Sequence, residues 1–264
     1  MSRRAISRFL QWAGLALGAL GVIAVVGFLV WAMNPLGPSE RAIAALKSDA
    51  SVRVTEWEGW YLFEPTWSDV MQPGTSTQAT IGLVFYPGGH VDVRSYSPLC
   101  RAIAAQGFLV ALQPMPLSLA VFRPDAGKDP ISAYPDVKTW GVAGHSLGGA
   151  MAAQWFSGAT IKLDGLALLG AYPPSGVDLT GSEAEFVSVY GSNDGAADSL
   201  PRAKAQLPPD TPFVVIEGGN HGQIGDYGPQ PGDGVATISA EEEQRQVTEA
   251  VVAMLRRAAA NASP

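Results

Sequence analysis

The chain has 264 residues, of which 47% are hydrophobic and 16% are charged, and this balance excludes an intrinsically disordered protein. Its formal net charge of -7 excludes the strongly basic surface on which nucleic-acid binding depends. One cysteine and three histidines rule out an intrachain disulfide framework and leave little material for a metal site. We therefore expect a globular enzyme or binding domain with no cofactor, no metal and no nucleic-acid partner, and the oligomeric state stays open.

The N-terminal segment has the composition of a membrane-spanning helix. Residues 9–39 contain no charged side chain, and residues 12–33 are almost continuously apolar. In a helix that rises about 1.5 Å per residue, this apolar stretch covers the roughly 30 Å hydrocarbon core of a bilayer. Three arginines and no acidic residue precede it, which predicts a cytoplasmic N-terminus. We expect a basic cytoplasmic stretch at 1–8, a single-pass signal-anchor helix at 9–33 and an extracytoplasmic domain.

The alternative for this segment is a signal peptide that is cleaved, which would make the protein secreted. Val30 and Ala32 are small residues at the positions that signal peptidase reads before a cut after Ala32. The apolar stretch exceeds the roughly 7–15 residues typical of a signal peptide, so its length favours the anchor. The proline-rich sequence at 34–38 breaks the helix and predicts a short linker to a domain at 39–264.

Strand and helix patterns alternate beyond the linker. One or two strands are expected within 52–63, and further strands at 79–86, 108–112, 140–143, 166–169, 186–190 and 213–216. Helices are expected at 39–47, 94–106, 150–156 and 241–259. Strands that are separated by helices form a mostly parallel sheet with helices on both faces, so the sequence predicts an α/β fold.

A tight turn around Ser146 carries the pattern of a catalytic nucleophile. Gly144, Ser146 and Gly148 form a Gly-x-Ser-x-Gly pattern between a strand that ends at Ala143 and a helix of small residues. Glycines are needed there because side chains would clash in so sharp a strand-to-helix turn. The pattern alone is weak evidence, and its position between strand and helix gives it weight. The turn also puts Ser146 at a helix N-terminus, where the dipole stabilises negative charge.

Asp194 and His221 complete the order Ser, Asp, His that a triad of this type follows along the chain. Each comes just after one of the last two expected strands, at the edge where open α/β sheets bind ligands. We expect Ser146 to be the nucleophile, His221 the general base and Asp194 the acid that orients it. Asp198 is the alternative acid. Considered alone, Asp194 would be interpreted as a turn cap and His221 as a surface loop residue. The placement of all three residues at the ends of their strands favours catalysis.

Acyl transfer also needs backbone donors for the oxyanion that forms in the transition state. The N–H of Leu147, which follows the nucleophile, is one expected donor. The second is expected from Gly89 or His90, because the glycine-rich turn at 87–90 follows a buried strand and lets backbone approach a substrate. The alternative is a glycine turn without a ligand. His145 is expected to pack beside the nucleophile and not to act as the base.

The sequence resembles the α/β-hydrolase superfamily in four stretches, namely residues 86–92, 144–149, 190–195 and 219–221. Over about residues 79–260 it is most similar to the fold-5 group, the dienelactone-hydrolase-like serine hydrolases. The resemblance implies the same roles for Ser146, Asp194 and His221 as the residues themselves suggest. Pro87 stands where many lipases of the superfamily carry a histidine, and this departure leaves the second oxyanion donor open.

The loops around the expected site bear on its substrate. Only about 14 residues separate two strands at 172–185, so no large cap domain is expected there. The segment 223–238 is either a wall of the pocket or a rigid surface connection, and the segment 114–122 is either an apolar wall or core packing.

The leading interpretation is a membrane-anchored serine hydrolase, esterase-like, that cleaves a small-molecule or lipid-like ester or thioester through an acyl-enzyme on Ser146. The rivals are a non-catalytic binding module of the same fold and a hydrolase of lactone, amide or C–C bonds. The same three residues serve all of these reactions, so the sequence does not choose among them.

Overall fold

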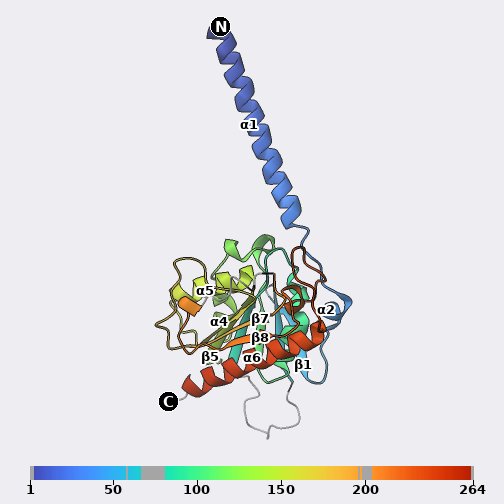
Figure 1. The fold of residues 1–264 in the computed structure, drawn as a ribbon, viewed down its shortest axis with the longest axis vertical. Helices are drawn as coiled ribbons and strands as arrows, with labels where there is room; N and C mark the ends of the chain where they lie inside the picture. The colour runs from blue at the N-terminus through green and yellow to red at the C-terminus, as the bar shows by residue number, and fades with distance from the viewer. Residues whose placement is uncertain (1–2, 58, 67–80, 196, 198–203, 263–264) are drawn as a thin grey trace. The chain divides into compact units, whose positions relative to one another are not determined.

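The structure is a computed structural model that describes residues 3–57, 59–66, 81–195, 197 and 204–262 (Figure 1). The chain divides into two compact units, Met1–Pro35 and Leu36–Pro264. The second unit contains every β-strand that the structure describes, and it therefore carries the fold.

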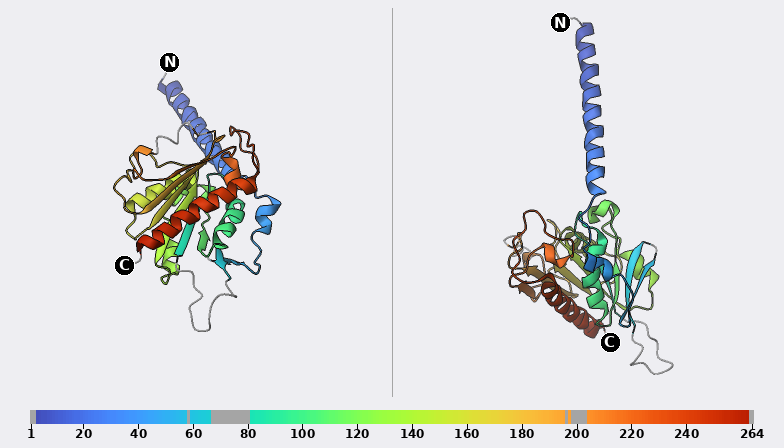
Figure 2. Two further views of the ribbon diagram at one scale, coloured as in Figure 1. Left: turned by 60° about the horizontal axis from the view of Figure 1, so that its bottom comes forward. Right: turned by 90° about the vertical axis from the view of Figure 1, so that its right-hand side faces the viewer.

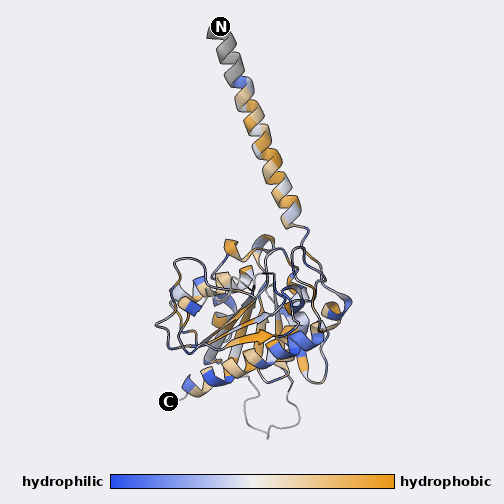
Figure 3. Ribbon diagram, in the orientation of Figure 1, coloured by the Kyte–Doolittle hydropathy of each residue, from blue (hydrophilic) through white to orange (hydrophobic). Residues whose placement is uncertain are grey.

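The first unit is a single helix, α1, which spans Arg3–Ala32. Its segment Gln11–Ala32 has a mean hydropathy of 2.5, and no part of its most apolar window is buried in the structure. Figure 3 shows apolar residues along most of its described length. The helix begins within the basic stretch and ends one residue before the predicted boundary at 33. By length and composition alone, α1 can cross a membrane.

The second unit is built on one mixed sheet whose described strands have the order β1-β2-β4-β3-β5-β6-β7-β8. The first two strands pair antiparallel with each other, and β2 also pairs antiparallel with β4. All the remaining pairs are parallel, as the alternating pattern predicts. The bounds are Val52–Trp57, Trp60–Pro65, Ile81–Tyr86, Leu109–Leu112, Thr139–His145, Gly165–Leu169, Glu185–Gly191 and Phe213–Ile216 for β1 to β8.

Helices cover both faces of this sheet, and side chains of each strand alternate between the two resulting cores. On β3, Leu83 and Phe85 join one core, whereas Val84 and Tyr86 join the other. The first core includes α3 (Ser97–Ala104) and α6 (Ala240–Ala262), which lie on the same face of the sheet in Figure 2. The second includes α5 (Leu147–Gly158), and α4 (Lys128–Ala133) packs on this side. Both faces of the central strands are therefore buried, which is why the parallel strands are largely apolar.

The predicted helices and strands are confirmed, with shifts at their ends. The helix expected at 94–106 starts as a 3₁₀ turn, η1 (Val93–Tyr96), and α5 begins at Leu147 and not at residue 150. The helix α2 is only Glu40–Ala44, but Ser39 caps it as expected by accepting the Ala42 N–H at 3.1 Å. Residues 79 and 80 of one predicted strand lie outside the described residues.

The linker expected at 34–38 is partly built into the second unit. The Leu36 N–H donates to the His90 carbonyl oxygen, and the Asp92 N–H donates to the Leu36 carbonyl oxygen, both at 2.9 Å. The second unit therefore begins three residues before the predicted start at 39. Its N-terminal residues are bonded to the loop that follows β3, at the carboxyl edge of the parallel strands.

Candidate active site

Ser146 occupies a strained turn at the carboxyl end of β5. Its φ of 52° and ψ of -124° place a residue with a side chain in a backbone region that favours glycine. The Ser146 N–H donates to the Leu169 carbonyl oxygen at 3.0 Å, and the Ser146 carbonyl oxygen accepts the Ala150 N–H at 3.1 Å. These two bonds hold the turn between the neighbouring strand β6 and the first turn of α5. The serine side chain is therefore presented at the edge of the sheet, as predicted.

The glycines of the motif are required by close backbone approach. A Cβ on Gly144 would lie 2.6 Å from the backbone of Gly148 and Gly149, and a Cβ on Gly149 would lie 2.5 Å from the Ala171 side chain. A Cβ on Gly148 would collide with the carbonyl oxygen of Pro87, in the turn after β3. The start of α5 therefore packs directly on that turn, which brings the two expected sources of oxyanion donors together.

Asp194 and His221 meet across two neighbouring loops. Asp194 follows β7 and His221 follows β8, and the Asp194 Oδ2 lies 2.9 Å from the His221 Nδ1. Their side chains are 1% and 9% exposed, so this pair is formed away from bulk water. A hydrogen bond of this kind fixes which ring nitrogen of His221 carries the proton and leaves the other nitrogen, Nε2, to act as an acceptor. Asp198, the alternative acid, lies outside the described residues.

A cavity of about 610 Å³ brings the three predicted residues together, because Ser146, Asp194 and His221 all line it. Within the described residues no hydrogen bond joins the Ser146 hydroxyl to His221, so they share the cavity without being bonded. Such catalytic bonds are often long in a ligand-free protein and tighten when substrate binds. The rest of the described wall is largely apolar or small, and it consists of Leu147, Ala150, Met151, Gly170, Ala171, Tyr172, Pro174, Gly195, Gln230, Pro231, Gly232 and Asp233.

Two open questions about the pocket wall are answered by this lining. Residues 230–233 line the cavity, so this part of the segment 223–238 is a wall of the site, and the rest of the segment does not line it. None of the residues 114–122 lines it, and Met115 is buried in the core, so that segment does not form the wall. The described segment 170–184 contains no helix, and the expected absence of a cap there agrees with the structure.

His145 lies beneath the site as a buried, packed residue. It is 1% exposed, its ring centroid lies 4.4 Å from that of His221, and it does not line the cavity. Its Nδ1 lies 2.8 Å from the Tyr96 hydroxyl, which also accepts the Gly88 N–H at 2.9 Å. Burial holds the pKa of His145 well below its usual value, so the ring stays neutral. This supports the expectation that His145 packs beside the nucleophile.

The turn after β3 narrows the choice of the second oxyanion donor. The His90 N–H donates to the Ser118 carbonyl oxygen at 2.8 Å, so it is not available to a substrate. This corrects one of the two expected donors in the turn. A Cβ on Gly89 would lie 2.8 Å from the Leu147 side chain, so these two residues are neighbours. Gly89 and Leu147 are therefore the backbone positions that remain.

Glu243 and Asp233 bind the backbone at Asn220 and His221, and the sequence did not single them out. The fully buried Glu243 accepts the Asn220 N–H at 3.0 Å through Oε2, and its Oε1 has no described hydrogen-bond partner. Burial raises the pKa of Glu243 to about 7. The Asp233 carboxylate accepts the His221 N–H at 3.1 Å. No spacing in the sequence links Glu243 to Asn220 or Asp233 to His221, because both hydrogen bonds exist only in the folded chain.

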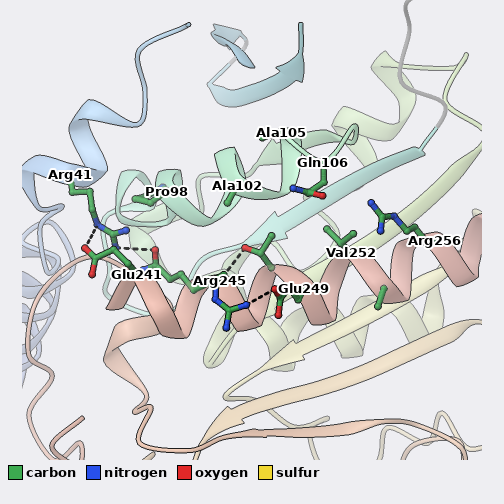
Figure 4. Close-up of a pocket in the computed structure, with 13 residues that line it drawn as sticks. Arg41, Pro98, Ala102, Ala105, Gln106, Glu241, Arg245, Glu249, Val252 and Arg256 are labelled. Atoms are coloured by element: carbon green, nitrogen blue, oxygen red, sulfur yellow. Dashed lines mark hydrogen bonds and ion pairs between the residues drawn. The ribbon is translucent and has the colours of Figure 1, made fainter. Parts of the chain in front are cut away.

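A separate cavity of about 640 Å³ lies between α3 and α6 and contains none of the three predicted residues (Figure 4). Its charged side chains are largely paired, for Arg41 contacts Glu241 and Arg245 contacts Glu249. No nucleophile with a neighbouring base lines it among the described residues. The candidate active site is therefore the cavity at Ser146.

The sequence matches the family model described as "Alpha/beta hydrolase family" over residues 82–246. This range includes Ser146, Asp194 and His221 and covers more than half of the chain. No curated protein sequence gives a significant match.

Solved structures of hydrolases share this fold at low sequence identity. Dienelactone hydrolase from Anabaena variabilis is 17% identical with a TM-score of 0.54, and the match covers 78% of this chain and all of that one. A soluble variant of monoglyceride lipase from Saccharomyces cerevisiae is 9% identical with a TM-score of 0.53, over 81% and 97% of the two chains. Esterase B from Lactobacillus rhamnosis, inhibited by a tributyrin phosphonate, is 13% identical with a TM-score of 0.51, over 97% of both chains. At these identities the likenesses establish the fold.

The contact between α5 and the turn after β3 predicts that Gly148→Ala is damaging. The added methyl group collides with a backbone carbonyl that cannot move like a side chain, so we expect a loss of about 1–3 kcal/mol in unfolding free energy. Displacement of the nearby turn should also lower ester turnover by about a hundredfold. Urea denaturation and ester hydrolysis measure the two effects.

Gly158→Ala in the same helix is the matched control. A Cβ there has no atom within 4 Å, so we expect unchanged activity and a stability gain of up to about 1 kcal/mol. Equal behaviour of the two variants would show that the close packing of α5 on the turn is unimportant.

The raised pKa of Glu243 predicts a specific pH dependence of stability. Between its usual value of 4.5 and about 7, the folded protein holds a proton that the unfolded chain has released. Unfolding free energy should therefore fall as pH rises through this window, and Glu243→Gln should remove part of that fall. Urea denaturation midpoints at pH 5, 6, 7 and 8 measure it.

Glu242→Gln is the control, because a hydrogen bond from Arg245 lowers the pKa of this partly exposed neighbour to about 2. Its own linkage lies below pH 4.5, so the slope between pH 5 and 7 should match the wild type. If unfolding free energy in the Glu243→Gln variant fell with pH as steeply as in the wild type, Glu243 would not be the group that causes the fall.

Proposed function

The chain belongs to the alpha/beta hydrolase family, and from this premise we propose that it is a membrane-anchored serine hydrolase that cleaves an ester or thioester. One observation carries the proposal. The strained turn of Ser146 and the hydrogen-bonded pair of Asp194 and His221 open on the same cavity. A turn that stores backbone strain at the mouth of a cavity is typical of a functional residue.

Each of the three residues has one role in this reaction. Ser146 Oγ attacks the carbonyl carbon of the substrate while His221 Nε2 takes the hydroxyl proton. The bond to the leaving alcohol or thiol then breaks, and His221 returns the proton to it. Water attacks the resulting acyl-enzyme by the same route, releases the acid and regenerates Ser146. Asp194 keeps the imidazole in the correct tautomer and stabilises its charged form.

Backbone amides stabilise the negative charge that develops on the substrate oxygen. Leu147 N–H is the first donor, because it lies at the N-terminus of α5, where the helix dipole adds to the stabilisation. Gly89 N–H is the second, because Gly89 is its neighbour and the His90 N–H is already bonded. Donors of this kind each lower the activation barrier by about 3–4 kcal/mol.

The lining of the cavity favours a neutral substrate. The described lining residues include Asp194 and Asp233 and no lysine or arginine. A free carboxylate on the substrate would therefore find no cationic partner among them. Alanine, methionine and proline side chains form much of the wall, which suits an apolar acyl chain. The proposed substrate is a neutral ester of small or lipid-like size.

The helix α1 is proposed to be a single-pass anchor with a cytoplasmic N-terminus. Its apolar length and the three preceding arginines support this orientation. The catalytic unit then lies outside the cytoplasm and remains close to lipid. Cleavage after Ala32 would instead release the same unit as a secreted enzyme.

We expect Ser146→Ala to abolish both covalent labelling by a fluorophosphonate and hydrolysis of p-nitrophenyl esters. The residual rate should be lower by at least about a thousandfold, because the acyl-enzyme cannot form. A series of p-nitrophenyl esters of increasing chain length, a thioester, a lactone and an amide would define the bond and the acyl size. Circular dichroism controls for folding.

Equal labelling of both proteins would place the reactive residue elsewhere. A folded wild-type protein that is neither labelled nor active on any of these substrates would favour the non-catalytic binding module.

The anchor predicts that the full chain resists extraction from membranes by alkaline carbonate, whereas residues 36–264 alone stay in the supernatant. Protease added to intact cells should cleave the catalytic unit and spare the N-terminus. Recovery of a shortened chain in the medium would support signal cleavage. Extraction of the uncleaved full chain by carbonate would contradict both the membrane anchor and the cleaved signal peptide.

A further inference from the structure

Asp233 binds the backbone on both sides of the Asp194–His221 pair. It belongs to the strap, which we define as residues 225–239, between η5 (Gly222–Ile224) and α6. Its Oδ1 accepts the N–H of His221 at 3.1 Å and that of Gly195 at 3.3 Å, and its Oδ2 accepts the N–H of Gly222 at 2.7 Å. One carboxylate therefore joins the loop of the base to the loop of the acid.

A purely local role does not explain these bonds. Only the fourth bond, from the Gly234 N–H at 2.8 Å, is to a sequence neighbour of Asp233. The other donors precede it by 11, 12 and 38 residues. A carboxylate that merely capped its own turn would have no reason to bond the residues next to both members of the catalytic pair.

The two loops are also in direct backbone contact, a few residues before the positions that Asp233 bonds. A Cβ on Gly191 would collide with the Gly219 backbone, and the Asn193 N–H donates to the Gly219 carbonyl oxygen at 2.9 Å. Such contact sets how close the loops come. It leaves open how far one loop can rotate against the other, and that rotation would change the distance between Asp194 and His221.

The strap provides the bonds that limit this rotation. The Asn193 Nδ2 donates to the Val235 carbonyl oxygen at 2.9 Å, and the Asn220 Nδ2 donates to the Gly234 carbonyl oxygen at 2.7 Å. Asn193 precedes the acid and Asn220 precedes the base, so each loop is tied to the strap by a side chain as well. Asp233 directly precedes these two ties in the strap, and its side chain accepts hydrogen bonds from both loops.

On these contacts we propose that Asp233 is a positioning residue, which holds the Asp194 and His221 loops in the relative orientation that keeps the base aligned. The inference rests on the proposed function, since alignment matters only if His221 acts as the base. Asp233 also lines the cavity, so contact with substrate is the competing role.

Asp233→Asn is the informative variant. The amide replaces one acceptor oxygen with an NH₂ group, which then faces a backbone N–H donor, while the size of the side chain stays the same. A shift of about 1 Å between catalytic groups costs up to about a hundredfold in rate, so we expect kcat to fall by about ten- to a hundredfold. KM should change by less than about threefold, because the ground-state contacts of the substrate are retained.

Asp226→Asn is the matched control in the same strap. Its carboxylate accepts the Ser39 hydroxyl at 2.7 Å and the Arg41 Nε–H at 2.9 Å, and neither partner belongs to the catalytic loops. It removes the same charge and also breaks bonds to distant residues. We expect it to lower the melting temperature of the full chain in detergent while it leaves kcat within about twofold of the wild type.

A spectroscopic measurement separates positioning from stability. The His221 Nδ1–H bonded to Asp194 should give a low-field proton resonance in the wild type and in Asp226→Asn. This resonance should broaden or vanish in folded Asp233→Asn. A wild-type kcat in Asp233→Asn would overturn the inference. A rise in KM alone would also overturn it and would assign Asp233 to substrate contact.

Different results would reject the proposed hydrolase function and the positioning role of Asp233. If the wild type neither reacts with a fluorophosphonate nor hydrolyses any ester, the proposed function fails, but the resonance still reports whether Asp233 aligns His221 with Asp194. If the wild type is active and Asp233→Asn matches it in kcat, the proposed function stands and the positioning role fails.

Discussion

The left-handed backbone of Ser146 is the constraint on which the rest of the site depends. Holding a serine at a φ of 52° costs about 1–3 kcal/mol, and the hydrogen bonds to β6 and α5 offset this cost. The same turn starts α5 at Leu147, which leaves that residue's N–H outside the helical hydrogen bonds and pointing with the helix dipole. The packing of Gly148 on the Pro87 carbonyl then brings the turn after β3 alongside. One strained residue therefore positions the proposed nucleophile and lies beside both proposed oxyanion donors.

A second constraint concerns the carboxylates that crowd around His221. Asp194 accepts from the imidazole, whereas Asp233 and Glu243 accept from backbone N–H groups of the residues beside it. Backbone N–H donors satisfy carboxylate oxygens without adding positive charge. The three carboxylates therefore hold the Asp194 and His221 loops in place, while the surroundings of His221 remain negatively charged. Glu243 shows the cost of this arrangement, because burial and the nearby acids raise its pKa to about 7. The three carboxylates therefore order the two loops but repel one another.

The strap, residues 225–239, forms part of the wall of the cavity at Ser146. The described segment between β6 and β7 contains no helix that would cover Ser146, and residues 230–233 of the strap form part of the cavity wall. The same strap is bonded near its start to the residues that follow the linker, since Asp226 accepts from Ser39 and Arg41. The N-terminal end of the second unit and the wall of the site are thus parts of one hydrogen-bonded framework. In the part of the chain that the structure describes, loop residues of the strap therefore border the cavity where a cap helix between β6 and β7 would otherwise lie.

The sequence by itself determined the α/β fold, the alternation of elements, the apolar helix near the N-terminus and the positions of Ser146, Asp194 and His221. These features depend on local patterns, such as apolar runs of strand length, glycines around a serine, and polar residues directly after strands. Only the tertiary structure decided which backbone N–H groups are already bonded, and it removed His90 as an oxyanion donor because the Ser118 carbonyl oxygen accepts a hydrogen bond from the His90 N–H. It also revealed Asp233 and Glu243, whose partners lie 11 to 38 residues away along the chain. Hydrogen bonds across such distances follow from how loops cross at the sheet edge, and no periodicity in the sequence records that crossing.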